Sequence, residues 1–283
     1  MRRALTMLGR GVLWLVLGGG LLWAIAVGAM LVERRSLIYP LATGFDAAAP
    51  DGMPRIRYAQ VPSADGTPIG VWVSPPVGPR PVILHFTGNG GFTPGAARTM
   101  APYAMRGYGV VIMNYRGAGG APGGPSQARI MEDAAAVYAA LDTLAPGQRP
   151  IVLHGVSLGA AVAVQLAVRA PADAVVLAVP FASLCTVVEH HYPWLPACLI
   201  MWDERWESAA AAPAIRAPVL VVGAGRDTVV PEAEALRLNR AMTAPTRYVR
   251  LAAAGHADFQ RHGSVEAVLD WLDALGLSAA GEQ

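Results

Sequence analysis

The sequence predicts an α/β fold with a mostly parallel central sheet that helices cover on both faces. Six apolar runs follow one another along residues 81–251, and segments with a helical period lie between most of them. These runs are continuously apolar, as parallel strands are when both faces of their sheet are buried. Two alternating segments flank a turn signal at Asp65-Gly66 and predict an antiparallel hairpin at one edge.

The expected elements follow from these patterns in chain order. The expected strands occupy residues 55–62, 68–74, 81–86, 109–115, 150–154, 174–179, 218–223 and 247–251. The expected helices occupy residues 95–106, 127–144, 158–169, 231–242 and 264–275. Residues 181–213 interrupt the alternation, because this Trp- and Pro-rich interval is longer than the usual loop of roughly two to six residues. We expect this insertion to lie over the carboxyl ends of the strands, where open α/β sheets place their ligands.

The composition excludes several functional classes. The 283 residues are 54% apolar and only 15% charged, which excludes an intrinsically disordered chain. The 22 basic and 20 acidic residues leave a net charge of +2, which is too small for an electrostatic nucleic-acid interface. The sequence contains no lysine, so a Walker phosphate loop and Schiff-base lysine chemistry are both excluded.

The N-terminal segment, residues 1–35, contains a candidate membrane anchor. Residues 11–32 carry no ionisable side chain, and a helix of that length is about 33 Å long, enough to cross a hydrocarbon core of roughly 30 Å. The alternative is a cleaved signal peptide, whose apolar region is usually shorter, at about 7–15 residues. Three arginines precede the apolar stretch and two follow it, so the positive-inside rule places the remainder of the chain outside the cytoplasm. We therefore expect a single-pass membrane protein with one domain at 36–276 and a tail at 277–283.

A serine motif stands between an expected strand and an expected helix. Gly155-Val156-Ser157-Leu158-Gly159 matches the Gly-x-Ser-x-Gly nucleophile elbow, whose sharp turn lifts the serine hydroxyl clear of the sheet. Glycine is expected at the flanking positions because any side chain there would collide with its neighbours. The amino terminus of the following helix favours the negative charge that develops during attack on a carbonyl. The alternative is a tight turn that contains a serine with no catalytic role.

A serine nucleophile needs a base that is held in place by an acid. In folds with such an elbow, the order along the chain is serine, acid, histidine. Asp227 follows the expected strand 218–223, and His256 follows the expected strand 247–251. Ser157, Asp227 and His256 thus stand at the carboxyl ends of separate strands, where they can converge. We expect them to form a catalytic triad.

The remaining polar candidates fit these roles less well. His190 and His191 precede Asp227 and would break the expected order, whereas Asp258 follows the histidine. Structural or ordinary surface positions are expected for the others, which are His85, His154, His262, Asp133 and Asp173.

An acyl-transfer site also needs hydrogen-bond donors for the oxyanion. The first expected donor is the backbone N–H of Leu158, directly after the nucleophile. The second is the backbone N–H of Asn89, within the loop Thr87-Gly88-Asn89-Gly90-Gly91 that follows strand 81–86. An ordinary turn is the alternative for this loop, which lacks the Gly-x-Gly-x-x-Gly spacing of dinucleotide sites.

Cysteine and histidine usage predicts neither a metal site nor a cofactor. The six histidines and two cysteines show no metal-ligand spacing. Cys185 and Cys198 both lie in the insertion, where they could pair in an oxidising compartment or remain as free buried thiols.

Four short motifs carry a resemblance to a known family. They are Leu37-Ile38-Tyr39-Pro40, Gly88-Asn89-Gly90, Asn114-Tyr115-Arg116-Gly117 and Arg226-Asp227-Thr228-Val229-Val230-Pro231. The elbow, the triad candidates and the oxyanion loop make residues 36–276 resemble the serine hydrolases of the α/β-hydrolase fold. The four motifs carry a narrower resemblance, to the membrane-anchored branch that includes single-pass relatives of monoacylglycerol lipases and protein depalmitoylases. It implies that Tyr115-Arg116-Gly117 shapes the active-site floor, with a structural turn as the alternative. Relatives usually carry His-Gly-Asn where this chain has Thr87-Gly88-Asn89.

The sequence therefore predicts a membrane-anchored serine hydrolase that cleaves acyl esters or thioesters through an acyl-enzyme. The expected substrates are acyl-containing small molecules, lipids or acylated proteins, and the aromatic insertion beside an anchor favours an apolar acyl chain. A serine peptidase or amidase of the same fold is the enzymatic alternative, because a triad does not identify the leaving group. A catalytically silent, membrane-tethered binding protein is the alternative from another class.

Overall fold

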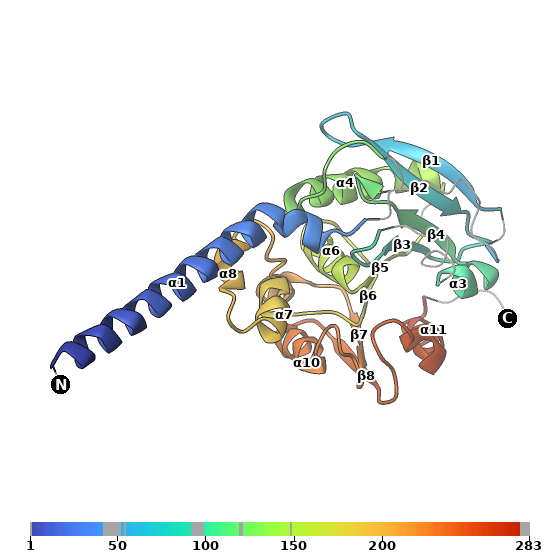
Figure 1. Cartoon of the computed structure of the whole chain (residues 1–283). Helices are drawn as coiled ribbons and strands as arrows, with labels where there is room; N and C mark the ends of the chain where they lie inside the picture. The colour runs from blue at the N-terminus through green and yellow to red at the C-terminus, as the bar shows by residue number, and fades with distance from the viewer. Residues whose placement is uncertain are drawn as a thin grey trace.

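The computed structural model describes residues 2–41, 52–53, 55–91, 99–118, 121–147 and 149–277. Helix α1 (Arg2–Ile38) is continuous, and its N-terminal part projects from the domain as a rod (Figure 1). By length and composition, its segment Arg10–Ile38 can cross a membrane, although an N-terminal signal sequence passes the same test. The predicted span, residues 11–32, lies within this segment.

The expected strands all occur in one eight-stranded sheet. They are β1 (Arg57–Pro62), β2 (Pro68–Ser74), β3 (Val82–Phe86), β4 (Gly109–Met113), β5 (Ile151–Val156), β6 (Ala174–Ala178), β7 (Val219–Ala224) and β8 (Thr246–Leu251). Their order across the sheet is β1-β2-β4-β3-β5-β6-β7-β8. β2 pairs antiparallel with both β1 and β4, and the other neighbouring pairs are parallel. The prediction of a mostly parallel sheet with an antiparallel edge is confirmed.

Helices cover both faces of the sheet, as the continuously apolar strands predict. Outside the insertion they are α3 (Ala101–Met105), α4 (Gln127–Ala139), α5 (Leu141–Leu144), α6 (Leu158–Ala167), α10 (Glu232–Ala241) and α11 (Ser264–Ala274). Side chains of α4, α6 and α10 enter one core cluster, and those of α3 and α11 enter the other. Helix α3 occupies the end of the expected helix 95–106, whose residues before 99 lie outside the described part of the chain.

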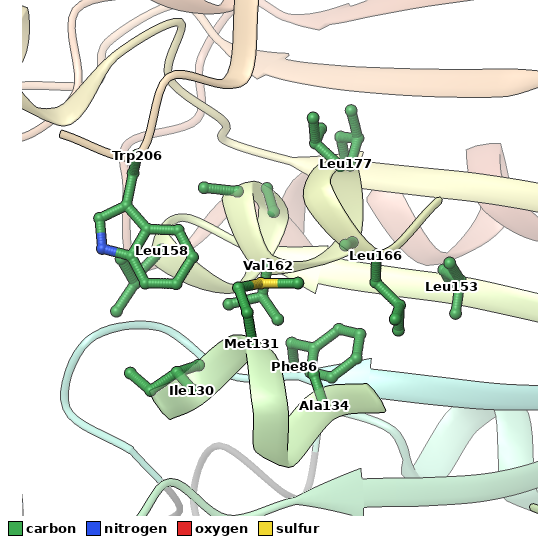
Figure 2. Packing of buried hydrophobic residues seen from close by; sticks show 14 of the residues in the cluster. Phe86, Ile130, Met131, Ala134, Leu153, Leu158, Val162, Leu166, Leu177 and Trp206 are labelled. Carbon is green, nitrogen blue, oxygen red and sulfur yellow. The ribbon is translucent and has the colours of Figure 1, made fainter. Parts of the chain in front are cut away.

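The two cores share each strand between them. In β4, Val111 enters the first core cluster and Val110 enters the second, so successive side chains point to opposite faces. Figure 2 shows the first cluster, where Phe86 from β3, Val162 from α6 and Met131 from α4 come together. Helix α6 is rich in buried alanine, which accounts for part of the apolar composition and lets the helix lie close to the sheet.

The insertion folds into short helices. They are α7 (Leu184–His191), α8 (Ala197–Ile200), α9 (Ser208–Ala211) and the 3-10 helix η2 (Ala212–Ala214). The segment around α8 packs beside the end of α1. Cys185 in α7 and Cys198 in α8 form a disulfide, so the structure favours pairing over free thiols. Trp206 is fully buried and joins the first core cluster (Figure 2).

Asp133 does not occupy the solvent-exposed position that the sequence predicts. It is fully buried in α4, where its carboxylate accepts hydrogen bonds from the Arg116 guanidinium and from the Ser63 hydroxyl. Arg116 also donates to Asp65 in the hairpin turn, at 2.8 Å. The network fastens the edge hairpin to α4, which favours the structural alternative for Arg116. The helical pattern could not reveal this burial, because the partners of Asp133 lie on other elements.

Candidate active site

Ser157 lies on a sharp turn between β5 and α6. Its backbone has φ 54° and ψ −115°, a conformation that residues other than glycine rarely adopt. A Cβ on Gly155 would lie 2.1 Å from the carbonyl oxygen of Gly159, and a Cβ on Gly159 would lie 2.1 Å from that of Phe86. Both positions therefore need glycine, because neighbouring backbone atoms lie too close to leave room for a Cβ atom. The geometry is that of the predicted elbow.

The three predicted triad side chains form one hydrogen-bonded row. His256 Nε2 lies 3.0 Å from Ser157 Oγ, and His256 Nδ1 lies 2.7 Å from Asp227 Oδ2. An ionised carboxylate only accepts hydrogen bonds, so the Nδ1–H donates to Asp227. This tautomer leaves Nε2 free to accept the serine proton. The catalytic roles of these residues stay predictions, but their convergence is a property of the structure.

Asp227 is fixed by its own loop. Its Oδ1 accepts hydrogen bonds from the backbone N–H groups of Val229 and Val230, at 2.9 and 2.8 Å. Its side chain is nearly inaccessible to solvent, at 2% exposure, whereas that of His256 is 19% exposed. The carboxylate is therefore held in one orientation, with Oδ2 directed at the imidazole ring.

Asp258 supports the turn that carries His256. The carboxylate that contacts the His256 ring is that of Asp227. Its Oδ1 accepts a hydrogen bond from the backbone N–H of Gly255 at 2.7 Å. That bond, with His262 nearby, lowers the pKa of the Asp258 carboxyl. Arg226 N donates to Ala254 O at 2.8 Å and so joins the Asp227 loop to the His256 loop.

The loop after β3 lies against the elbow. Gly91 N donates to Gly88 O at 3.0 Å, which closes a tight turn around Asn89. The buried hydroxyl of Tyr115 donates to Thr87 O at 2.7 Å and braces the start of the loop. Asn89 lines the same cavity as Ser157 and Leu158, which is the placement that the expected oxyanion donors require. Their role in binding an oxyanion stays a prediction.

Ser157 and His256 open into a cavity of about 380 Å³. Apolar side chains dominate its wall and come from α7, the segment around α8, and the loop after Asp227. The insertion therefore lines the same cavity as Ser157 and His256, which follow the carboxyl ends of β5 and β8. The wall residues contributed by the insertion are Phe181, Leu184, Val187, Val188, Tyr192, Leu195, Ile200 and Met201.

The end of α1 forms another wall of this cavity, which the sequence did not predict. Met30, Arg34, Leu37 and Ile38 all line it. Asn89 Nδ2 donates to the backbone oxygen of Ile38 at 3.2 Å, so the helix end also contacts the oxyanion loop. Only the motif at 37–40 could have drawn attention to this segment. An anchor helix is apolar on every face, so its sequence does not show which face lines a cavity.

Ionic contacts hold α1 against the insertion. Arg34 donates to both carboxylate oxygens of Asp203, at 3.1 and 2.9 Å. Arg35 donates to Asp203 and to the fully buried Glu204, each at 2.9 Å. Glu204 in turn accepts a hydrogen bond from the Tyr39 hydroxyl.

No cluster of three or more histidine, cysteine, aspartate or glutamate side chains suited to a metal ion occurs in the described part of the chain. His190 and His191 lie in edge-to-face contact on α7 and neither bonds Ser157, His256 or Asp227; His191 Nε2 donates to Val229 O at 2.9 Å. His85 and His154 are buried and face one another, with their Nδ1 atoms 2.9 Å apart.

A family model and several known proteins match the sequence of this chain. The Hydrolase_4 family model, described as serine aminopeptidase, S33, matches residues 78–207. The uncharacterized protein Rv2307c of Mycobacterium tuberculosis is 38% identical over 233 residues, which cover 80% of this chain and 81% of that protein. Lysophosphatidylserine lipase ABHD12 of Danio rerio is 31% identical over an alignment of 205 residues, gaps included, and the match covers 59% of this chain and 53% of that protein.

Solved structures agree on the fold. The esterase Pf2001 of Pyrococcus furiosus superposes with a TM-score of 0.64 at 18% identity, covering 78% of this chain and 92% of that structure. The Mycobacterium tuberculosis relative matches over four fifths of both sequences. The chain therefore belongs to the α/β-hydrolase family, and its relatives in sequence include a protein named lysophosphatidylserine lipase.

Proposed function

We propose that this chain is a membrane-anchored serine hydrolase that cleaves acyl esters or thioesters, in the branch that resembles monoacylglycerol lipases and protein depalmitoylases. The observation that carries the proposal is the row Ser157–His256–Asp227 at the wall of an apolar cavity. A positioned nucleophile, base and acid supply covalent catalysis, and the cavity supplies a place for an acyl chain.

The geometry accommodates acyl transfer in two stages. Ser157 Oγ attacks the acyl carbonyl carbon while His256 Nε2 takes the hydroxyl proton, and Asp227 stabilises the imidazolium. The backbone N–H groups of Leu158 and Asn89 stabilise the tetrahedral oxyanion, aided by the amino terminus of α6. His256 then protonates the leaving alcohol or thiol, and water releases the acyl group by the reverse sequence. This mechanism uses no metal ion or organic cofactor.

The substrate class follows from the lining of the cavity. Its wall is mostly aliphatic, and the candidate anchor contributes part of it. An apolar acyl chain therefore suits it better than a charged group, which would lose its hydration there. Lipids, acylated proteins and other acyl-containing molecules fit, and the name lysophosphatidylserine lipase of the Danio rerio relative supports a lipid.

The proposed arrangement places residues 11–32 across the membrane and the domain, 36–276, outside the cytoplasm. The disulfide between Cys185 and Cys198 supports this side, because such bonds persist in oxidising compartments. Protease treatment of sealed vesicles of known orientation tests the proposal. We expect external protease to digest the domain in right-side-out vesicles and to spare it in inverted ones; the opposite pattern would reverse the assignment.

Labelling with a fluorophosphonate probe tests the catalytic proposal. We expect the full chain in detergent to label covalently, and Ser157→Ala to abolish the labelling while the thermal midpoint stays unchanged. Equal labelling of Ser157→Ala, or none of the wild type, would reject Ser157 as nucleophile. Absent labelling of the wild type would favour the catalytically silent binding protein.

A serine peptidase or amidase is the second candidate, because the matching family model is described as serine aminopeptidase, S33. A panel of esters, thioesters and amides with the same acyl chain separates the two. We expect kcat/KM to be highest for the ester or thioester. A higher value for the amide would favour the peptidase.

A further inference from the structure

The insertion exposes a group of large apolar side chains close together in the sequence. Tyr192, Trp194, Leu199 and Trp202 are 47, 46, 73 and 67% exposed. Single exposed apolar residues are ordinary on any protein surface, but several grouped beside one another mark an interaction surface. We call these four residues the aromatic patch.

The aromatic patch belongs to a segment that contacts the candidate membrane-spanning helix at two levels. Near the helix end, Arg34 binds Asp203, the immediate neighbour of Trp202. Farther toward the N-terminus, Trp23 Nε1 donates to the backbone oxygen of Trp194 at 3.0 Å. Figure 1 shows α8 beside this stretch of α1, whose N-terminal part projects beyond the domain.

These contacts fix how far the insertion extends along the anchor. Trp23 lies nine residues before Val32, the last residue of the uncharged stretch, and so about 13 Å from it along the helix axis. A bilayer that excluded Trp194 would leave the exposed apolar side chains of residues 24–32, which include Ile25, Leu31 and Val32, in water. If the bilayer covers those residues, lipid reaches the level of Trp194.

We propose that the aromatic patch of the insertion is embedded in the lipid bilayer beside the anchor, so that the domain sits directly on the membrane. The proposal rests on the membrane anchoring given above and adds a second contact, made by the domain itself. The depths are ordered: Trp202 lies with the charged Arg34 and Asp203 at the headgroup level, and Trp194 lies deeper. Tryptophan and tyrosine are the side chains that favour this interfacial zone.

The location of the cavity gives the contact a functional consequence. Met30 of the anchor and Tyr192 and Leu195 of the insertion line the cavity that holds Ser157. Two elements that both contact lipid therefore line the cavity that receives the acyl chain. The insertion then acts as the entry side for substrates that are dissolved in the membrane.

Quenching of tryptophan fluorescence by brominated lipid tests the proposal without reference to catalysis. The full chain is reconstituted in phosphatidylcholine vesicles with or without bromine on the acyl chains. The difference between wild type and Trp194→Phe, or Trp202→Phe, gives the emission of each residue. We expect bromine to reduce both emissions about twofold or more, with bromines near the middle of the acyl chains acting more strongly on Trp194.

Trp271→Phe is the matched control, because Trp271 is buried in the core on the opposite face of the sheet, and its emission should not respond to bromine. Emission from Trp194 and Trp202 that bromine leaves unchanged would overturn the proposal and would place water or protein against the patch.

A second measurement compares two equally exposed positions. Leu199 and Met105 are 73 and 71% exposed, on the insertion and on α3. We expect Leu199→Glu to hydrolyse a long-chain ester in vesicles about tenfold more slowly, because a charge in lipid is costly, and Met105→Glu to match the wild type. Both variants should label with fluorophosphonate in detergent like the wild type. Wild-type rates for Leu199→Glu on vesicles would overturn the proposal, whereas absent labelling of the wild type would reject the hydrolase and leave the bromine result standing.

Discussion

At the scale of single residues, two glycines determine whether Ser157 can stand where it does. Gly155 and Gly159 each meet backbone atoms so closely that no side chain fits. Gly159 also brings α6 against the end of β3, which is where the loop carrying Asn89 begins. One close contact thus sets the distance between the nucleophile and the expected oxyanion donor.

The first prediction concerns Gly159→Ala. Its Cβ would lie 2.1 Å from Phe86 O, so α6 must move away from β3 and carry Ser157 with it. We expect unfolding free energy to fall by about 3 kcal/mol, and kcat/KM to fall about 100-fold because a shift of about 1 Å misaligns the attack. Ester hydrolysis and thermal unfolding in detergent measure the two effects. Gly124→Ala is the control, since a Cβ at that exposed position meets nothing within 4 Å; an unaffected Gly159→Ala would contradict the close-contact explanation.

At the scale of elements, the sheet was predictable and the packing around the cavity was not. The strands could be located because continuous apolar runs record burial on both faces, and the glycines of the elbow record a local collision. Asp227 and His256 could be located because each follows a strand. By contrast, Arg34 and Asp203 are 169 residues apart, and no local pattern reports their contact. The burial of Asp133 escaped prediction for the same reason.

The second prediction tests how the insertion is held against α1. The buried Glu204 carboxylate accepts hydrogen bonds from Arg35, from the Tyr39 hydroxyl, and from the backbone N–H of Gln127. Burial raises the pKa of Tyr39, as does the adjacent charge of Glu204, so the phenol remains a donor. Glu204→Gln removes the carboxylate charge and places the glutamine amide N–H groups next to donors that need an acceptor. We expect this change to lower the unfolding free energy by about 3 kcal/mol.

The measurement combines thermal unfolding with limited trypsin digestion at Arg205, which lies beside Glu204. Glu204→Gln should lower the thermal midpoint and speed this cleavage, because the insertion detaches from the anchor. Glu207→Gln is the neighbouring control and should behave as the wild type. Unchanged cleavage and an unchanged midpoint in Glu204→Gln would show that the insertion is held by its apolar contacts alone.

At the scale of the whole molecule, a buried histidine pair links stability to pH. His85 on β3 and His154 on β5 are almost inaccessible to solvent, and Tyr103 packs its ring against His154. Burial lowers the pKa of His154 to about 4 and that of His85 well below its ordinary value, an effect that the charge of His154 reinforces. In the unfolded chain both rings titrate near about 6.5. The folded protein therefore holds both rings neutral over a pH range in which the unfolded chain binds protons.

The third prediction follows from that difference. Between about pH 6.5 and 4 the unfolded chain binds more protons, so the unfolding free energy falls as pH falls, by about 1 kcal/mol per pH unit for each histidine. The pKa of His154 is about 4 in the folded protein and about 6.5 in the unfolded chain. When the pH falls from about 6.5 to about 4, this difference lowers the unfolding free energy by roughly 3 kcal/mol. Urea denaturation of the detergent-solubilised chain at pH 7, 6 and 5 measures the slope above the range in which carboxylates titrate. His154→Asn should reduce that slope by about half, and the exposed His190→Asn should leave it unchanged. An equal unfolding free energy of the wild type at pH 7 and pH 5 would contradict the prediction. It would mean that the histidine pair takes up protons in the folded state, and that the sheet opens between β3 and β5 without unfolding.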